Sequence, residues 1–252
     1  MRLTVVGCSG SIPGPDTAAS CYLVEADGFA LVLDLGSGAL GPLQHHLDLA
    51  EIGTVLLSHL HADHCIDLTS LTVAIKHGPF GRDRAIPVLG PSGLAARVAE
   101  MHGVRDEADV RELHDLLDLA EVSESTWAIG PFQVTARHVD HPVEAYAYRI
   151  QHAGRTLVYS GDCAPCPGLD EVARGADLAL VEAAYSDHDP TNSPGVHHTG
   201  REAGELATRV GAARLVVTHV PPWHDPLAAA DAARTAFAGQ VEVAWPGGSY
   251  EV

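Results

Sequence analysis

The sequence predicts one α/β domain, and three observations support that prediction. The chain has 252 residues, of which 46% are apolar and 19% charged, the balance of a folded globular protein. Short β-rich runs alternate with longer helical stretches along its length. No shift in composition, Pro/Ser-rich linker, repeat or low-complexity tract divides it. We therefore expect residues 1–252 to fold as a single domain.

Short runs of apolar and β-branched residues predict the strands. In chain order these are 3–6, 21–25, 30–34, 54–58, 86–89, 132–137, 145–150, 156–159, 178–181, 215–218 and 241–245. Several are followed directly by His or Asp. Functional groups collect at the carboxyl ends of strands in open α/β sheets, so these polar residues are candidates for a shared site.

Apolar residues at helical spacing predict helices at 39–49, 65–77, 92–101, 200–210 and 226–238. The fourth is the best specified, because Thr199 and Glu202 fit a capping box and Gly211 follows the last turn. The acidic segment 104–126 predicts a further amphipathic helix packed on the body. Its apolar face would carry four leucines, Leu113, Leu116, Leu117 and Leu119.

The chain is strongly acidic, with a formal net charge of −18. Proteins hold long nucleic acids by neutralising phosphates with Lys and Arg, so this composition disfavours DNA or RNA as a partner. A small phosphorylated ligand is compatible with this charge if a local cationic centre outweighs the repulsion from the negative charges elsewhere on the protein. The 16 histidines outnumber the 15 Lys and Arg, and neutral imidazole is the commonest metal ligand.

The first residues read as a strand rather than as a secretory signal. No apolar run approaches the roughly 20 residues that span a bilayer, so we expect a cytoplasmic protein with no membrane partner. The five cysteines are an odd number in a chain large enough to build its own core. This argues against a disulfide scaffold.

The strongest chemical signal is the segment 58–64, which reads Ser-His-Leu-His-Ala-Asp-His after an apolar strand. When a strand leads into a tight loop, several side chains of the loop can point into one small volume. Here these are His59, His61, Asp63 and His64. Imidazole nitrogens and a carboxylate suit zinc or a similar divalent ion. One such histidine is usually structural, but four ligands in six positions predict a metal site.

Further ligand candidates follow other strands. Asp162 ends the run that begins with strand 156–159, and His219 directly follows strand 215–218. His138 and His141 follow strand 132–137 and compete for one ligand role. We favour His141 because Pro142 closes the strand after it.

The candidates outnumber the four ligands of one tetrahedral zinc. They are His59, His61, Asp63, His64, His141, Asp162 and His219. Two divalent ions bridged by Asp162 account for the number and leave room for a water or substrate oxygen. The ions carry +4, and two carboxylates with a bridging hydroxide carry −3, so about +1 remains to attract an anionic substrate. We expect zinc, although manganese and iron take the same ligands.

His197 lies just before the predicted helix 200–210. A helix N-terminus with a histidine beside it favours a phosphate oxygen. His197 is therefore a candidate both to bind substrate and to donate a proton to a leaving group. The alternative, that His197 or His198 is an ordinary loop residue, stays open on these grounds.

At these residues the chain resembles the metallo-β-lactamase superfamily, whose His-x-His-x-Asp-His hallmark is present at 59–64. The later ligands occur in the family's order, as His141, Asp162 and His219, and the match covers nearly the whole chain. The resemblance implies an αβ/βα four-layer sandwich, two mixed sheets flanked by helices, and a homodimer. The motif is specific for the dinuclear fold and much less so for the substrate.

Within the superfamily the chain resembles the ribonuclease Z-like phosphodiesterases, through His-His-Thr at 197–199 and Thr-His-Val-Pro-Pro at 218–222. This implies that Asp63 and His197 cooperate in general acid catalysis. The tRNA-processing enzymes carry an arm between the ligands matching His141 and Asp162, where only 20 residues lie here. Because no arm fits, the chain looks more like the short actinobacterial cyclic nucleotide phosphodiesterases.

We therefore expect hydrolysis of a small cyclic nucleotide, 3′,5′-cyclic AMP to the 5′-monophosphate. The rivals are a ribonuclease Z-type RNA phosphodiesterase, a lactonase or other ester hydrolase, and a nucleotide-binding or redox-sensing protein without turnover. The redox alternative would use Cys163 and Cys166, which lack a thioredoxin-like context. Trp223 could stack on a base, but packing is its more ordinary role.

Overall fold

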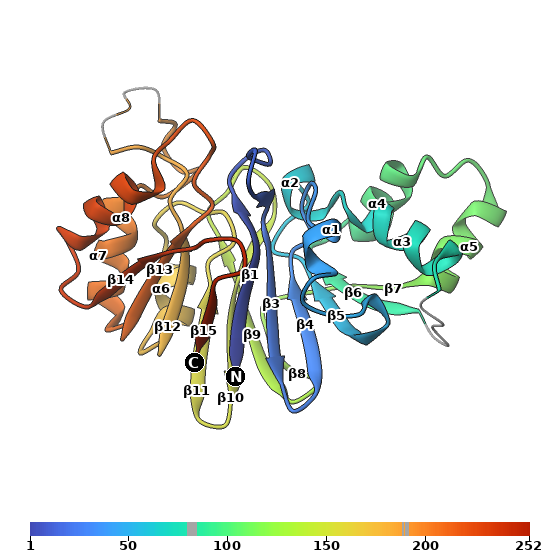
Figure 1. Ribbon diagram of the computed structural model, residues 1–252, viewed down its shortest axis with the longest axis horizontal. Helices are drawn as coiled ribbons and strands as arrows, with labels where there is room; N and C mark the ends of the chain where they lie inside the picture. The colour runs from blue at the N-terminus through green and yellow to red at the C-terminus, as the bar shows by residue number, and fades with distance from the viewer. Residues whose placement is uncertain (80–84, 188, 190–191) are drawn as a thin grey trace.

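The computed structural model describes residues 1–79, 85–187, 189 and 192–252. Two mixed β-sheets lie face to face, with helices on both outer sides (Figure 1). This is the four-layer αβ/βα sandwich that the family resemblance implies. No helix in the described ranges is long and apolar enough to cross a membrane.

The first sheet has the strand order β15-β1-β3-β4-β5-β6-β7, and β2 pairs with β1. Its strands are β1 (Arg2–Ser9), β2 (Ala18–Ala19), β3 (Cys21–Ala26), β4 (Phe29–Leu33), β5 (Ile52–Leu56), β6 (Ile86–Gly90), β7 (Leu117–Glu121) and β15 (Ser249–Glu251). Neighbours from β4 to β7 run parallel. Their carboxyl ends therefore share one edge of the sheet.

The second sheet has the order β14-β13-β12-β11-β10-β9-β8. Its strands are β8 (Thr126–Ile129), β9 (Phe132–Val139), β10 (Ala145–His152), β11 (Arg155–Tyr159), β12 (Leu178–Glu182), β13 (Arg214–Thr218) and β14 (Gln240–Val243). Neighbours from β8 to β11 are antiparallel, whereas those from β11 to β14 are parallel. The parallel half brings the ends of β11, β12 and β13 together.

The helices cover the outer faces of the sheets (Figure 1). Those on the first sheet are α1 (Leu40–Leu43), α2 (Ala62–Cys65), α3 (Leu68–His77), α4 (Leu94–His102) and α5 (Glu107–Leu116), and those on the second are α6 (Pro167–Ala173), α7 (Gly200–Val210) and α8 (Pro226–Arg234). A third apolar layer fills the space between the sheets. Each buried leucine or phenylalanine in these layers contributes about 1.5–3 kcal/mol.

Tyrosines in the central layer connect the core to the strand ends. Tyr22 and Tyr148 are fully buried, and a buried hydroxyl needs a hydrogen-bond partner. Tyr148 donates to the carbonyl oxygen of Leu57 at 2.8 Å, directly after β5. Tyr22 pairs with the Thr218 hydroxyl at 2.6 Å, at the end of β13. These bonds fix the two strand ends relative to the core.

Two predicted helices are wrong in part. Of 39–49, only Leu40–Leu43 is α-helical, and a short 3₁₀ helix follows at Leu49–Glu51. The helix predicted at 65–77 begins earlier in the structure, at Ala62, and it is divided into α2 and α3 before Leu68. At the interruption the Asp67 backbone N–H donates to Leu35 O instead of continuing the helix, and the Asp67 carboxylate accepts from Leu40 N. Tertiary hydrogen bonds therefore break the helix.

The segment 104–126 also differs from its prediction. Helix α5 ends at Leu116, and Leu117 begins β7, where it pairs with Ile86 of β6. The parallel partner supplies backbone hydrogen bonds that a helical pattern in the sequence does not reveal. The helix predicted at 226–238 ends earlier, at Arg234. Among the described residues, the sequence analysis missed the strands β2, β7, β8 and β15 and the helix α6.

Candidate metal centre

The chain leaves β5 through a loop that is anchored by a buried carboxylate. Asp34, at the end of β4, accepts from the Ser58 backbone N–H at 2.6 Å and from the Ser58 hydroxyl at 2.8 Å. The loop then reaches His61, which precedes the single turn of α2. The hallmark segment is thereby held against the neighbouring parallel strand.

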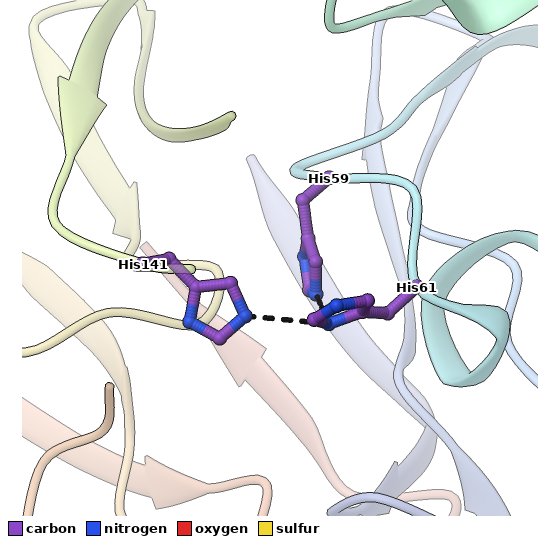
Figure 2. A group of neighbouring side chains, drawn as sticks. All are labelled: His59, His61 and His141. Carbon is purple, nitrogen blue, oxygen red and sulfur yellow. Dashed lines mark hydrogen bonds between the residues drawn. The ribbon is translucent and has the colours of Figure 1, made fainter. Parts of the chain in front are cut away.

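Three histidines converge with their ring nitrogens facing one another (Figure 2). His61 Nδ1 lies 3.0 Å from His59 Nε2 and 3.3 Å from His141 Nε2. His141 Nδ1 donates to the Val196 carbonyl oxygen at 3.0 Å, which leaves its Nε2 lone pair directed at the cluster. Burial lowers the pKa of all three rings, so they are neutral at pH 7. Converging lone pairs on neutral imidazoles form a cation site.

A second group lies beside the first and consists of Asp63, His64, Asp162 and His219. His64 Nε2 is 3.3 Å from Asp162 Oδ1, and His219 Nε2 is 3.1 Å from Asp162 Oδ2. His64 Nε2, His219 Nε2 and Asp162 Oδ1 are buried without a hydrogen-bond partner among the described residues. Each such atom costs about 1–3 kcal/mol if nothing satisfies it. Their concentration at one point indicates a site for a bound cation.

Asp162 lies between the two groups. Its Oδ2 atom is 3.8 Å from His59 Nε2 in the first group and 3.1 Å from His219 Nε2 in the second. Burial alone would raise the pKa of Asp162, but His219 and His64 hold it well below the usual value, so the carboxylate is charged. The combined His/Asp cluster is suited to two metal ions.

All seven predicted ligands lie in this cluster, including His141. His138, the rival candidate, is exposed, and its ring lies 5.9 Å from that of Tyr146. Strand alternation explains the difference, because His138 is still in β9 and faces solvent. His141 lies beyond the strand, in the loop that turns toward the centre.

Hydrogen bonds behind the cluster orient two of its imidazoles. His64 Nδ1 donates to Asp34 Oδ2 at 2.7 Å, and His219 Nδ1 lies 2.8 Å from the Ser20 hydroxyl. Occupying Nδ1 in this way leaves Nε2 to face the centre. Asp34 also accepts from the Tyr159 hydroxyl at 2.5 Å and has a left-handed φ of +55°. The sequence analysis did not predict this orienting role of Asp34.

His197 lies at the edge of the same cluster. Its Nδ1 atom is 2.8 Å from Glu182 Oε1 and 4.0 Å from Asp162 Oδ2. Burial alone would lower the pKa of His197, but the Glu182 carboxylate raises it to about 9. The predicted capping box of Thr199 and Glu202 is present and fixes the start of α7 at Gly200, three residues after His197.

Glu182 was missed in the sequence. It is fully buried at the end of β12 and accepts from the backbone N–H groups of Cys163 at 2.8 Å and Ala184 at 3.0 Å, as well as from His197. The available signal was the one that identified Asp162, an acidic residue at the end of an apolar parallel strand. His198 is a structural residue, because it is buried and its Nδ1 donates to the Cys163 carbonyl oxygen at 2.6 Å.

The structure also places the Cys163/Cys166 pair and Trp223, which the sequence analysis considered for redox and stacking roles. Cys163 and Cys166 are buried free thiols next to the Asp162 loop. Trp223 is 62% exposed, so the expectation that it packs in the protein is wrong.

Comparisons with known proteins agree with this geometry. The Beta-lactamase superfamily domain model matches residues 31–220. An uncharacterized protein of Mycobacterium tuberculosis is 38% identical over 259 residues, covering 100% of this chain and 92% of that protein. A ribonuclease Z of Mycobacterium bovis is 31% identical over 267 residues, covering 96% of this chain and 95% of that protein.

A Bacillus subtilis protein named "Probable metallo-hydrolase YhfI" is 31% identical over 262 residues, and the match covers 100% of both chains. The crystal structure of this metallo-β-lactamase fold protein superposes with a TM-score of 0.87, covering 100% of this chain and 99% of that one. The fold, the His/Asp cluster and these relatives lead to one conclusion. The chain belongs to the metallo-β-lactamase superfamily and is a metallo-hydrolase related to ribonuclease Z.

Proposed function

We propose that this hydrolase is a phosphodiesterase that converts a small cyclic nucleotide, 3′,5′-cyclic AMP, to 5′-AMP. The observation that carries the proposal is the position of His197, held by Glu182 beside both ligand groups. An alkoxide leaving group needs a proton as its bond to phosphorus breaks. A histidine with Nδ1 on a carboxylate and Nε2 without a hydrogen-bond partner among the described residues meets that need.

Two divalent ions, when bound, supply an acidified water and positive charge for the phosphate oxygens. The seven-residue His/Asp cluster would hold them, and its imidazole-rich composition favours zinc, with manganese and iron as outcomes of metal analysis. Asp63 would orient the attacking oxygen as it approaches phosphorus. His197 would donate its Nε2 proton to the departing 3′ oxygen, and Glu182 would stabilise the protonated ring before that transfer.

Two features support a small substrate over a long RNA. The net charge is −18, which opposes a polyanion beyond the metal centre. Most of the 20 residues between His141 and Asp162 form the β10–β11 hairpin within the sheet, so they build no protruding arm. We expect the substrate to be recognised within the site instead of along an extended surface.

The test is to incubate the metal-loaded protein in parallel with cyclic AMP, pre-tRNA and a lactone. We expect 5′-AMP as the main product and its loss in His197→Ala but not in His138→Ala, the matched exposed histidine. If the protein cleaves pre-tRNA or the lactone in preference to cyclic AMP, the assignment of cyclic AMP as substrate is wrong. Nucleotide binding without any product would favour a sensor.

A further inference from the structure

A cavity of about 470 Å³ opens beside His197. Its volume lies in the range of about 300–1,000 Å³ that is typical of small-molecule sites. Among the described residues, none of the seven candidate metal ligands lines it. His197 therefore belongs both to the edge of the metal centre and to a separate hollow next to it.

The lining of this cavity has a specific chemical character. Pro165 and Tyr185 provide apolar and aromatic surface, and the Tyr185 ring packs edge-on against His197 with centroids 5.0 Å apart. The polar side chains of the lining are the Asn192 amide, the Ser193 and Thr199 hydroxyls, His197 itself and the carboxylates of Asp140 and Glu202. No Lys or Arg is among the described lining residues, and the two carboxylates outnumber the one protonated group, His197. Such a lining suits a neutral group that donates hydrogen bonds and opposes a second phosphate.

The position of His197 indicates on which side of the scissile phosphate the cavity lies. If His197 protonates the departing oxygen, the group attached to that oxygen lies on the His197 side of the scissile phosphate. In a cyclic nucleotide that group is the nucleoside itself, since the 3′ oxygen stays on the ribose. A base amine and a ribose hydroxyl are donors that match the carboxylate and amide acceptors of the lining.

We propose that the cavity lined by Asp140, Pro165, Tyr185, Asn192 and Glu202 is the subsite for the leaving-group side of the substrate. It accepts a neutral nucleoside and rejects one that carries an additional phosphate. This inference rests on the proposed phosphodiesterase activity, because it needs His197 to face the leaving oxygen.

The test compares two dinucleotides that differ only on the leaving nucleoside, adenylyl-3′,5′-adenosine and its 5′-phosphorylated form. For the metal-loaded protein we expect kcat/KM to be at least about tenfold higher without the extra phosphate. In the double variant Asp140→Asn/Glu202→Gln this ratio should fall toward one, because both negative charges are gone. Glu202→Gln alone should lower it partially, since glutamine still serves in a capping box.

Glu205→Gln is the matched control, because Glu205 is exposed on the same helix and does not line the cavity. It should retain the ratio of the unmodified protein. Bis(p-nitrophenyl) phosphate, which has no nucleoside, separates the two proposals. If it is cleaved while both dinucleotides react equally, or if the charge variants leave the ratio unchanged, the subsite is wrong and the phosphodiesterase stands. If no phosphodiester is cleaved, both proposals fail.

Discussion

His197 Nδ1 lies 2.8 Å from Glu182 Oε1, and this contact links a buried strand end to the edge of the metal cluster. Glu182 is held by two backbone N–H groups, so it cannot turn away from the ring without losing both. The pair therefore fixes the imidazole and favours its protonated form.

Replacing His197 by alanine should lower kcat for cyclic AMP by about 10²–10⁴-fold, the usual contribution of a general acid. The loss should be smaller for bis(p-nitrophenyl) phosphate, because p-nitrophenolate leaves without a proton. Steady-state kinetics on both substrates, with metal content measured alongside, tests this. Equal losses on the two substrates would contradict proton donation by His197.

The variant Glu182→Gln should move the alkaline limb of the kcat/KM profile to lower pH. Glu182 raises the pKa of His197 to about 9, so the protonated ring persists below that pH and is lost as pH rises through it. Removing the carboxylate charge removes the main cause of the increase. A pH–rate profile from 6 to 10, with Glu205→Gln as the control, checks the shift. An alkaline limb at the same pH in both variants would exclude the proposed coupling.

Asp34→Asn should weaken metal binding by about 10–100-fold, the usual cost of losing a partner behind a metal ligand. Asparagine tolerates the left-handed φ of +55° at this position, so the backbone should keep its shape. Its amide accepts fewer hydrogen bonds than the four that Asp34 receives from Ser58, His64 and Tyr159. Competition with a chelator measures the affinity, and unchanged binding would show that Asp34 does not position His64.

Gly36→Ala should reduce both metal content and activity. A Cβ atom there would lie 1.9 Å from the Asp63 carbonyl oxygen, a backbone atom that cannot yield without moving the α2 turn. Gly41→Ala is the matched control, because nothing lies within 4 Å of the same added atom and the residue is within α1. Metal analysis and thermal denaturation should separate the two variants. Similar behaviour would mean that the turn tolerates displacement.

Local chemistry explains which elements the sequence could predict. Helix α7 has the predicted bounds because its capping box and the left-handed Gly211 at its C-terminus are encoded within a few residues. By contrast, Leu117 changes from a helical pattern to a strand because of its partner Ile86, about 30 residues earlier. Likewise, Asp67 ends a helical run through bonds to residues 27 and 32 positions away. Such long-range partners leave no local signal.

The same distinction holds at the site. The hallmark histidines were readable because several ligands stand close together in the sequence, and Asp162 and His219 because each follows an apolar strand. Glu182 and Ser20 were not assigned, because their roles depend on His197 and His219, which are distant in the chain. The homodimer and the cytoplasmic location stay predictions.

Anomalous diffraction from crystals of the metal-loaded protein tests the central claim most directly. We predict two ions in each chain, one bound by His59, His61 and His141, the other by Asp63, His64 and His219, with Asp162 contacting both. A single ion, or ions bound away from Asp162, would contradict the two-metal centre and the hydrolytic mechanism built on it.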